Sequence, residues 1–383
     1  MKKVLASLLA AAVLAGAALA MTGCGEMTLR KKYEDYFLVG ATMNSGNYLG
    51  YEELASEFSS MTCENEMKWN NLQPDEGLFT YALADEMIDF AVEHDMKVRG
   101  HCIGWHNKDA VPSWVYSGTF EDAKERLLTH TTEVITHFGE KYGDTVYAWD
   151  VWNEMLTDDR DQDDTNLFRV SYGDDAANGS RWHQLAGLAR NNTPEERAAA
   201  NEKIEDLIVE TFAVARACAP EGTKLYYNEY FENNTDKCQK MIVLLEDLLE
   251  KGCEIDGVGI QAHYDINSFD PEMLEQLILD IHELGLDVQI TEVDFSMYNY
   301  NGDRDLYYYE FTEEMEELQA SCFGKVYEIA RKHKDKVSCV TQWGVADDDS
   351  YLFNMPVSNR QDWPYLFDAD LQPKLAYYAV MDF

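Results

Sequence analysis

The stretch from Val146 to Glu154 reads VYAWDVWNE, an apolar run rich in aromatic and β-branched residues that ends on an acidic side chain. The segment before it has a helical pattern, because Leu128, Ile135 and Phe138 fall on one helix face. Regular alternation of helices and strands is typical of α/β folds. This unit therefore predicts an α/β fold.

The same alternation continues along the chain in both directions. Helical faces recur at 241–249 and 311–326. The strand-like runs are Phe37–Ala41, Met61–Cys63, Lys97–Trp105, Val146–Glu154, Leu225–Tyr230, Gly257–Tyr264, Asp287–Phe295 and Val337–Val345. Such a series predicts a single (β/α)8 TIM barrel, a fold that needs about 250 residues or more. A doubly wound sheet is disfavoured, because no glycine-rich phosphate turn follows the first run. We expect the barrel to occupy residues 37–383, with extra length from Met155 to Lys224.

The N-terminus has the pattern of an export signal. Lys2 and Lys3 precede an apolar run from Val4 to Ala20 that is short for a membrane span. Gly23 before Cys24 resembles a bacterial lipobox, so Cys24 is a candidate for lipidation, while cleavage after Ala20 is the alternative. We predict a signal peptide over residues 1–24 and a short charged spacer over 25–36. The protein is then an exported bacterial cell-surface lipoprotein, or else a secreted protein.

Composition limits the partners. The formal net charge is −40, which disfavours nucleic acid and anionic lipid and favours a neutral ligand, although such a charge also serves solubility. The eight cysteines form no C-x-x-C pair, and Cys102 and Cys339 lie in apolar strand-like runs. We expect mostly reduced cysteines in the core, with one or two disulfides left open.

Polar, aromatic and titratable residues stand where the strand-like runs end. In chain order they are Glu64, Asn65, Lys68, His101, Trp105, His106, Asp150, Asn153, Glu154, Asn228, Glu229, Gln261, His263, Tyr264, Glu292, Asp294 and Trp343. A barrel gathers the carboxyl ends of its strands on one face, which carries the active site. Two carboxylates among neutral hydrogen-bonding groups and aromatic rings are what glycoside hydrolysis requires.

Several of these segments resemble the signatures of glycoside hydrolase family 10, in the family's order from Phe37 to Phe383. The matching segments are Glu64-Asn65-x-Met67-Lys68-Trp69, Gly100-His101, Trp105-His106, Trp149-Asp150-Val151-x-Asn153-Glu154, Gly257-Val258-Gly259-Ile260-Gln261-x-His263-Tyr264, Ile290-Thr291-Glu292-x-Asp294, Trp343-Gly344-Val345-x-Asp347 and Leu366-Phe367-Asp368. Members of that family are mainly endo-β-1,4-xylanases that retain anomeric configuration. The resemblance therefore implies a glycosidase.

The resemblance also implies roles for individual residues. Glu154 would be the general acid/base and Glu292 the nucleophile. The residues expected to bind substrate are Asn153 and His106 at the cleavage point, Gln261, His263 holding Glu292, Glu64, Asn65 and Lys68 on the non-reducing side, and Trp343 beneath the sugars. Asp150 and Asp294 would support these groups from behind. His101, Trp105 and Trp149 are open between core and site, as are Tyr230 and Tyr264.

Three positions depart from the family pattern. Lys108 stands where a glutamine is usual, which puts one sugar contact in doubt. Glu229 replaces a common aspartate, and Tyr351 replaces a frequent tryptophan that roofs the site. None of them removes a catalytic carboxylate.

We predict a retaining endo-β-1,4-xylanase that acts on xylan and xylo-oligosaccharides as a monomer. The alternatives are a β-1,4-glucanase or aryl glycosidase on the same barrel, and a non-catalytic glycan-capturing lipoprotein. We expect no cofactor and no metal. Asp159, Asp161 and Asp163 have EF-hand spacing, but Asp164 and Val170 replace the glycine and glutamate that such a loop needs. A solvated acidic loop is favoured there.

Overall fold

The computed structural model describes residues 27–158, 167–169, 180–189, 191–231 and 233–383. The signal peptide, the lipidation candidate Cys24 and the acidic loop with Asp159, Asp161 and Asp163 lie outside the described residues. Those expectations stay predictions. No helix in the described part of the chain is both long and apolar enough to cross a membrane.

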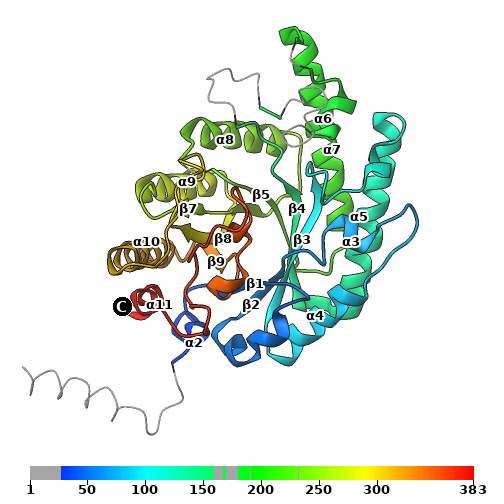
Figure 1. The fold of residues 1–383 in the computed structure, drawn as a ribbon. Coiled ribbons are helices and arrows are strands. Elements are labelled where there is room, and N and C mark those ends of the chain that lie inside the picture. Colours follow the sequence, from blue (N-terminus) through cyan, green and yellow to red (C-terminus); the bar gives the residue numbers. More distant parts are fainter. Residues whose placement is uncertain (1–26, 159–166, 170–179, 190, 232) are drawn as a thin grey trace, which may run out of the picture.

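The strands form a closed parallel barrel (Figure 1). They are β1 Leu38–Met43, β2 Ser60–Cys63, β3 Lys97–Trp105, β4 Val146–Asn153, β5 Lys224–Glu229, β6 Gly257–Ile260, β7 His263–Asp265, β8 Asp287–Ser296 and β9 Val337–Gln342. Each pairs with its neighbour in parallel, and β9 returns to β1 with Val340 opposite Val39, which closes the ring. Both β6 and β7 pair with β8, so they are two pieces of one barrel stave. The predicted (β/α)8 TIM barrel is confirmed.

Helices cover the outside of the barrel. The described α-helices are α2 Leu29–Lys32, α3 Trp69–Leu72, α4 Ala82–Glu93, α5 Phe120–Tyr142, α6 Arg181–Ala186, α7 Pro194–Cys218, α8 Thr235–Glu250, α9 Pro271–Glu283, α10 Glu313–Lys332 and α11 Leu375–Met381. The short 3-10 helices are Tyr48–Glu57, Ser113–Tyr116, Gly143–Thr145, Asp347–Asp349 and Tyr351–Phe353. Local sequence explains where the long helices begin: Thr119 and Asp122 form a capping box at α5, and Thr193 and Glu196 form another at α7.

The segment expected to be a spacer is folded from residue 27 onward. Helix α2 buries Leu29, and Tyr33 after it is also fully buried, with its hydroxyl donating to the Val380 carbonyl at 2.6 Å. The Arg30 guanidinium donates to the Phe58 carbonyl. Leu29 and Tyr33 thus pack this part of the predicted spacer against the folded domain.

Packing between β3 and β4 depends on two glycines. A Cβ added at Gly100 would lie 2.2 Å from the Trp149 ring, and one at Gly104 would lie 2.7 Å from the Trp152 ring. Trp149 is almost fully buried, so it belongs to the core rather than to the site. The seven cysteines in the described ranges are all free, as expected for reduced core residues.

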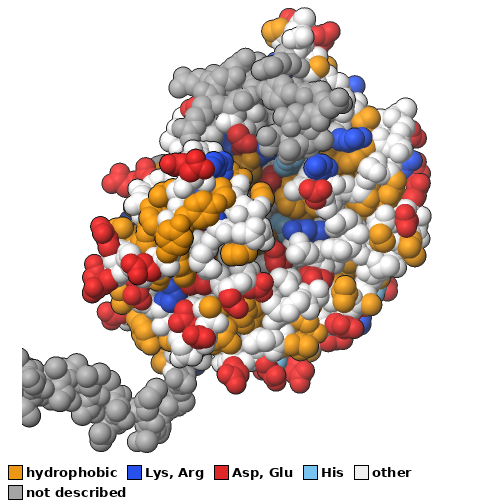
Figure 2. All heavy atoms as spheres, viewed as in Figure 1, with side chains coloured by type: hydrophobic (Ala, Val, Ile, Leu, Met, Phe, Trp, Pro, Cys, Tyr) orange, Lys and Arg blue, Asp and Glu red, His pale blue; other side chains and the backbone are white. Residues whose placement is uncertain are grey.

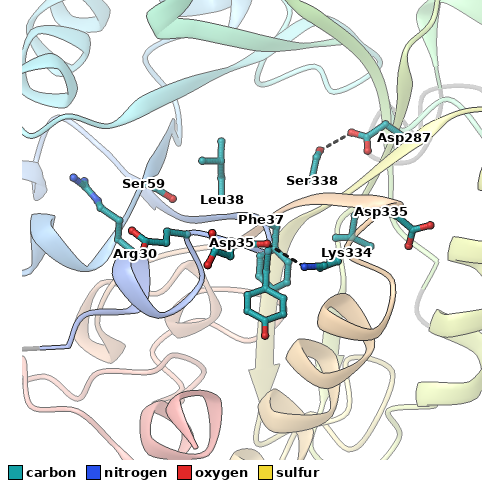
Figure 3. A pocket seen from close by; sticks show the side chains of 12 residues that line it. Arg30, Asp35, Phe37, Leu38, Ser59, Asp287, Lys334, Asp335 and Ser338 are labelled. Carbon is teal, nitrogen blue, oxygen red and sulfur yellow. Dashed lines mark hydrogen bonds between the residues drawn. The ribbon is translucent and has the colours of Figure 1, made fainter. Parts of the chain in front are cut away.

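An open cavity of about 550 Å³ lies beside the amino ends of β1, β8 and β9. Phe37, Leu38, Asp287 and Ser338 are among the residues that line it, and Ser338 hydrogen-bonds Asp287 (Figure 3). Because β1, β8 and β9 begin here, the cavity lies at the end of the barrel opposite their carboxyl ends.

Candidate active site

The residues predicted for the site meet at the carboxyl ends of the strands. In the space-filling view, a hollow in the middle of the molecule carries histidine and basic side chains, while carboxylates are spread over the surrounding surface (Figure 2). Glu154 directly follows β4, and Glu292 lies on β8. The hollow therefore brings carboxyl groups together with these cations and histidines.

The amide of Asn228, on β5, connects these two strands. Its Nδ2 donates to Glu292 Oε1 at 2.7 Å and to Asn153 Oδ1 at 2.9 Å. Its Oδ1 accepts from Thr291 Oγ1 at 2.7 Å, which fixes the orientation of the amide. Asn228 is fully buried, so its side chain holds Asn153 and Glu292 at a set spacing.

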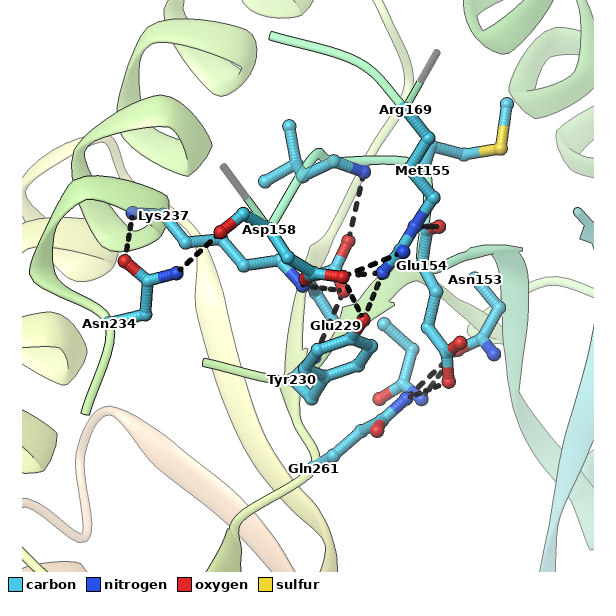
Figure 4. Close-up of polar contacts among 12 residues, drawn as sticks. Asn153, Glu154, Met155, Asp158, Arg169, Glu229, Tyr230, Asn234, Lys237 and Gln261 are labelled. Atoms are coloured by element: carbon cyan, nitrogen blue, oxygen red, sulfur yellow. Dashed lines mark hydrogen bonds and ion pairs between the residues drawn. The ribbon is translucent and has the colours of Figure 1, made fainter. Parts of the chain in front are cut away.

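The carboxyl group of Glu154 accepts two hydrogen bonds from neutral groups. Trp105 Nε1 donates to Oε2 at 3.0 Å. Gln261 Nε2 donates to Oε1 at 2.8 Å (Figure 4). Gln261 Nε2 also lies 3.4 Å from Asn153 Oδ1. A hydrogen-bonded series thus runs from Glu154 through Gln261, Asn153 and Asn228 to Glu292.

The carboxyl group of Glu292 is buried and has a charged partner. His263 Nε2 lies 3.2 Å from Glu292 Oε2, and His263 Nδ1 lies 2.8 Å from Asp294 Oδ2. Tyr351 also reaches His263, with its hydroxyl 3.2 Å from Nδ1. Burial favours the neutral imidazole, but Asp294 and Glu292 outweigh it and raise the pKa of His263 well above its ordinary value. A protonated His263 therefore donates to both carboxylates.

Asp150 lies behind the site and joins two basic groups. Arg99 donates to Asp150 Oδ1 at 2.6 Å, and His101 Nδ1 lies 2.9 Å from Asp150 Oδ2. Burial opposes ionisation of Asp150, but Arg99 and His101 outweigh it and lower its pKa. The His101 ring meets Trp343 edge-on at 5.4 Å. His101 is thus a buried histidine that supports the ring expected beneath the sugars.

A second polar group borders the same hollow. Lys68 Nζ donates to Asn65 Oδ1 at 3.0 Å, and Asn44 donates to Glu64 at 2.8 Å. The Lys68 ammonium also lies 5.3 Å from the centre of the Trp105 ring. Since Trp105 bonds Glu154, these residues are continuous with the carboxylate pair.

His106 lies close to the backbone of Glu154. It is buried, and its pKa is well below the ordinary value because of burial and the nearby cations Arg169 and Lys237. Its hydrogen bond goes to the backbone of Glu154. His106 is thus buried like Asn153, Gln261 and Glu292, whereas Glu64, Asn65, Lys68 and Trp343 are half-buried.

The three departures from the family pattern have separate surroundings. Lys108 is exposed, and Tyr351 contacts His263. Glu229 is fully buried and pairs with Lys237 at 2.9 Å. Burial raises the pKa of Glu229, an effect that Lys237 and Arg169 partly offset. It accepts the Leu156 amide at 3.1 Å, so it anchors the chain that follows Glu154.

Sequence reasoning missed several contacts. It placed Asn228 at a strand end without a role, and it left Trp105 open between core and site. Arg169 was not singled out, although its Nε donates to the Glu154 carbonyl at 3.0 Å. In the part of the chain that the structure describes, no group of three or more histidine, cysteine, aspartate or glutamate side chains is arranged to hold a metal ion.

Comparison with known proteins places this site in a family. The model for "Glycosyl hydrolase family 10" matches residues 28–383. A β-1,4-xylanase of Dictyoglomus thermophilum is 37% identical over 357 residues, covering 93% of this chain and 91% of that protein. Endo-1,4-β-xylanase A of Caldicellulosiruptor saccharolyticus is 35% identical over 365 residues, covering 93% and 96%. A solved mutant structure in complex with xylotriose superposes with a TM-score of 0.80 at 34% identity, covering 94% of this chain and 100% of that one.

Proposed function

The chain belongs to glycosyl hydrolase family 10, and from this membership and the geometry of the site we propose that it is a retaining endo-β-1,4-xylanase. The observation that carries the proposal is that the two carboxyl groups have different surroundings. Glu292 is buried against His263 and Asn228, whereas Glu154 is half-buried and bonded by two neutral donors. Two carboxyl groups in different environments suit two different roles.

In the first step, Glu292 attacks the anomeric carbon while Glu154 gives its proton to the departing glycosidic oxygen. The bond to the leaving sugar breaks, and an ester between Glu292 and the remaining sugar forms. Protonated His263 and the Asn228 amide hold the Glu292 carboxylate in a fixed direction before attack. Glu154 then takes a proton from a water molecule while the oxygen of that water attacks the anomeric carbon. The bond from the anomeric carbon to Glu292 breaks, Glu292 leaves as a carboxylate, and the original configuration is restored.

The surrounding residues fit the binding of a neutral sugar chain. Asn153 Nδ2 finds no acceptor among the described residues, and it lies beside the hydrogen-bonded series that joins the two carboxyl groups. It is therefore available to a sugar hydroxyl. Lys68, Asn65 and Glu64 supply further donors and acceptors, and Trp343 supplies a flat apolar surface.

Two variants test the catalytic roles. Glu292→Ala removes the attacking group, so turnover should be lost while binding of xylo-oligosaccharides, measured by calorimetry, is largely kept. Glu154→Ala should slow poor leaving groups far more than activated aryl xylosides, which need little acid assistance. Wild-type rates on xylan in both variants would refute the assignment.

Product analysis tests the substrate and the stereochemistry. The enzyme should release short xylo-oligomers from xylan and little from a soluble β-1,4-glucan. NMR at early times should show products of retained configuration. Products mainly from glucan would favour the glucanase alternative, and binding without products from either polymer would favour the capture-protein alternative.

A further inference from the structure

The backbone of Glu154 has an unusual conformation that its neighbours must hold. Its φ is +56°, in the left-handed region that residues with a side chain rarely adopt. The Glu154 amide donates to the Asn228 carbonyl at 3.0 Å. On the other side, the Glu154 carbonyl accepts from Arg169 Nε at 3.0 Å (Figure 4). Arg169 is therefore one of the groups that fix the direction of Glu154.

Backbone pairing brings Arg169 to this position from 15 residues further along the chain. Thr157 N donates to the Leu167 carbonyl at 2.9 Å, and Arg169 N donates to the Met155 carbonyl at 3.2 Å. These two bonds flank an antiparallel bridge between Leu156 and Phe168. Residues 167–169 therefore lie against the segment that immediately follows Glu154.

The guanidinium of Arg169 is held on its other edges as well. It pairs with the two oxygens of Asp158 at 2.8 and 3.3 Å, and it donates to the Tyr230 hydroxyl. Tyr230 in turn donates to Asp158 Oδ2 at 2.8 Å. Arg169 is buried, and its rigid planar group is fixed by two partners, Asp158 and Tyr230, besides the Glu154 carbonyl.

Lys237 on α8 balances the charge of this cluster. Its Nζ lies 2.9 Å from both Asp158 Oδ1 and Glu229 Oε1, and 3.3 Å from the centre of the Tyr230 ring. Burial opposes ionisation of Asp158, but Lys237 and Arg169 outweigh it and lower its pKa to about 2. Asp158 therefore keeps its negative charge at neutral pH.

We infer that Arg169 is a positioning residue for Glu154, acting through the backbone carbonyl rather than the carboxyl group. The two hydrogen bonds to the carboxyl come from Trp105 and Gln261. The cluster of Arg169, Asp158, Tyr230, Lys237 and Glu229 holds the left-handed backbone of Glu154 and so fixes the direction of its side chain. This inference rests on the proposed role of Glu154 as acid/base.

The dependence of rate on the leaving group tests the inference, because a merely structural defect slows good and poor leaving groups alike. In Arg169→Met, kcat/KM for phenyl β-xylobioside should fall at least about tenfold, a part of the 10²–10⁴ that acid catalysis supplies. For 2,4-dinitrophenyl β-xylobioside it should fall less than about threefold, because that leaving group needs little protonation. Arg169→Lys keeps the charge but not the planar fork, so it should restore part of the loss.

Two further variants make the outcome decisive. Arg216→Met is the matched control, because Arg216 also pairs with a carboxylate, Asp256, and donates to the Thr223 carbonyl at 2.7 Å, but at the amino end of the barrel strands. It should leave the ratio of the two rates unchanged. If Glu154→Ala shows no dependence on the leaving group, the proposed function fails.

If Glu154→Ala shows the dependence but Arg169→Met slows both substrates equally or neither, the positioning inference is overturned. Should Arg169→Met not fold, the same ratio in Arg169→Lys decides, and a wild-type ratio there would overturn the inference.

Discussion

Replacing the Asn228 amide with a carboxyl group should convert the site into one that works only at low pH. The substitution Asn228→Asp keeps the size of the side chain and leaves an oxygen to accept from Thr291. The Nδ2 atom that lies 2.7 Å from Glu292 Oε1 becomes an oxygen. A donor to the carboxylate is thus exchanged for a second carboxylate.

The geometry sets the size of the effect. Two charges about 4 Å apart repel by about 4 kcal/mol at an effective dielectric constant of about 20. At about 1.4 kcal/mol per pKa unit, the pair holds one shared proton up to about 3 units above an ordinary carboxyl, or near pH 7. Below that pH the proton lies between the introduced oxygen and Glu292 and stands in for the amide. Above it, the repulsion displaces Glu292 from its attacking position.

The assay is the pH profile of kcat/KM on an activated aryl xyloside. Near pH 5 the variant should lie within about tenfold of wild type. Above pH 7 the variant also loses the hydrogen bond donated to Glu292, and a hydrogen bond to a charged group contributes about 1.5–3 kcal/mol. Its kcat/KM should therefore fall by about two orders of magnitude. Gln276→Glu is the control, because Gln276 donates to Asp280 at 2.7 Å on the exposed face of α9. If kcat/KM of Asn228→Asp is lowered by the same factor at all pH values, the reasoning is refuted.

Three further changes have expected outcomes. Trp105→Phe removes one donor to the acid/base carboxyl and should lower kcat/KM on substrates with poor leaving groups about tenfold or more. Trp114→Phe removes a hydrogen bond to a backbone carbonyl instead, and should leave this kcat/KM nearly unchanged. Gly100→Ala should lower the free energy of unfolding in urea by about 1–3 kcal/mol through overpacking, while Gly50→Ala, with open space around it, should change it little. The pKa of Asp158 is about 2 in the folded protein and about 3.9 in an unfolded chain. Its contribution to the free energy of unfolding is therefore present above pH 4 and lost as the pH falls toward 2. In Asp158→Asn, the free energy of unfolding should depend less on pH in this range.

The strands and the motifs at their ends could be predicted because both follow from local sequence. The run predicted at Lys97–Trp105 is β3 itself, and the run from Val146 contains β4. Apolar runs mark buried strands, and a barrel brings all their carboxyl ends to one face. The sixth run was predicted as continuous, but the structure breaks it between β6 and β7, where Ala262 has a φ of +67°. An alanine gives no sign of such a conformation.

Contacts made by returning segments could not be predicted. Arg169 reaches Glu154 only because residues 167–169 pair with 155–157, and a bridge this short has no periodic pattern. Likewise, Leu29 and Tyr33 stand among charged residues in the sequence, yet their side chains are buried in the hydrophobic core. Asn228 was visible at a strand end, but its partners come from β4 and β8, which only the closed barrel brings together.

The two carboxyl groups are supported in ways that match the different demands of the proposed reaction. A nucleophile needs one charge state and one direction, and the Glu292 carboxylate accepts from a half-buried, protonated histidine and from the Asn228 amide. An acid/base must give up and regain a proton in each cycle, so a strong ion pair to its carboxyl would trap one state. Glu154 instead has neutral donors, Trp105 and Gln261, on its carboxyl, while the charged group, Arg169, holds its backbone. Placing the cation on the carbonyl rather than the carboxyl fixes the direction of the side chain and leaves its proton free to move.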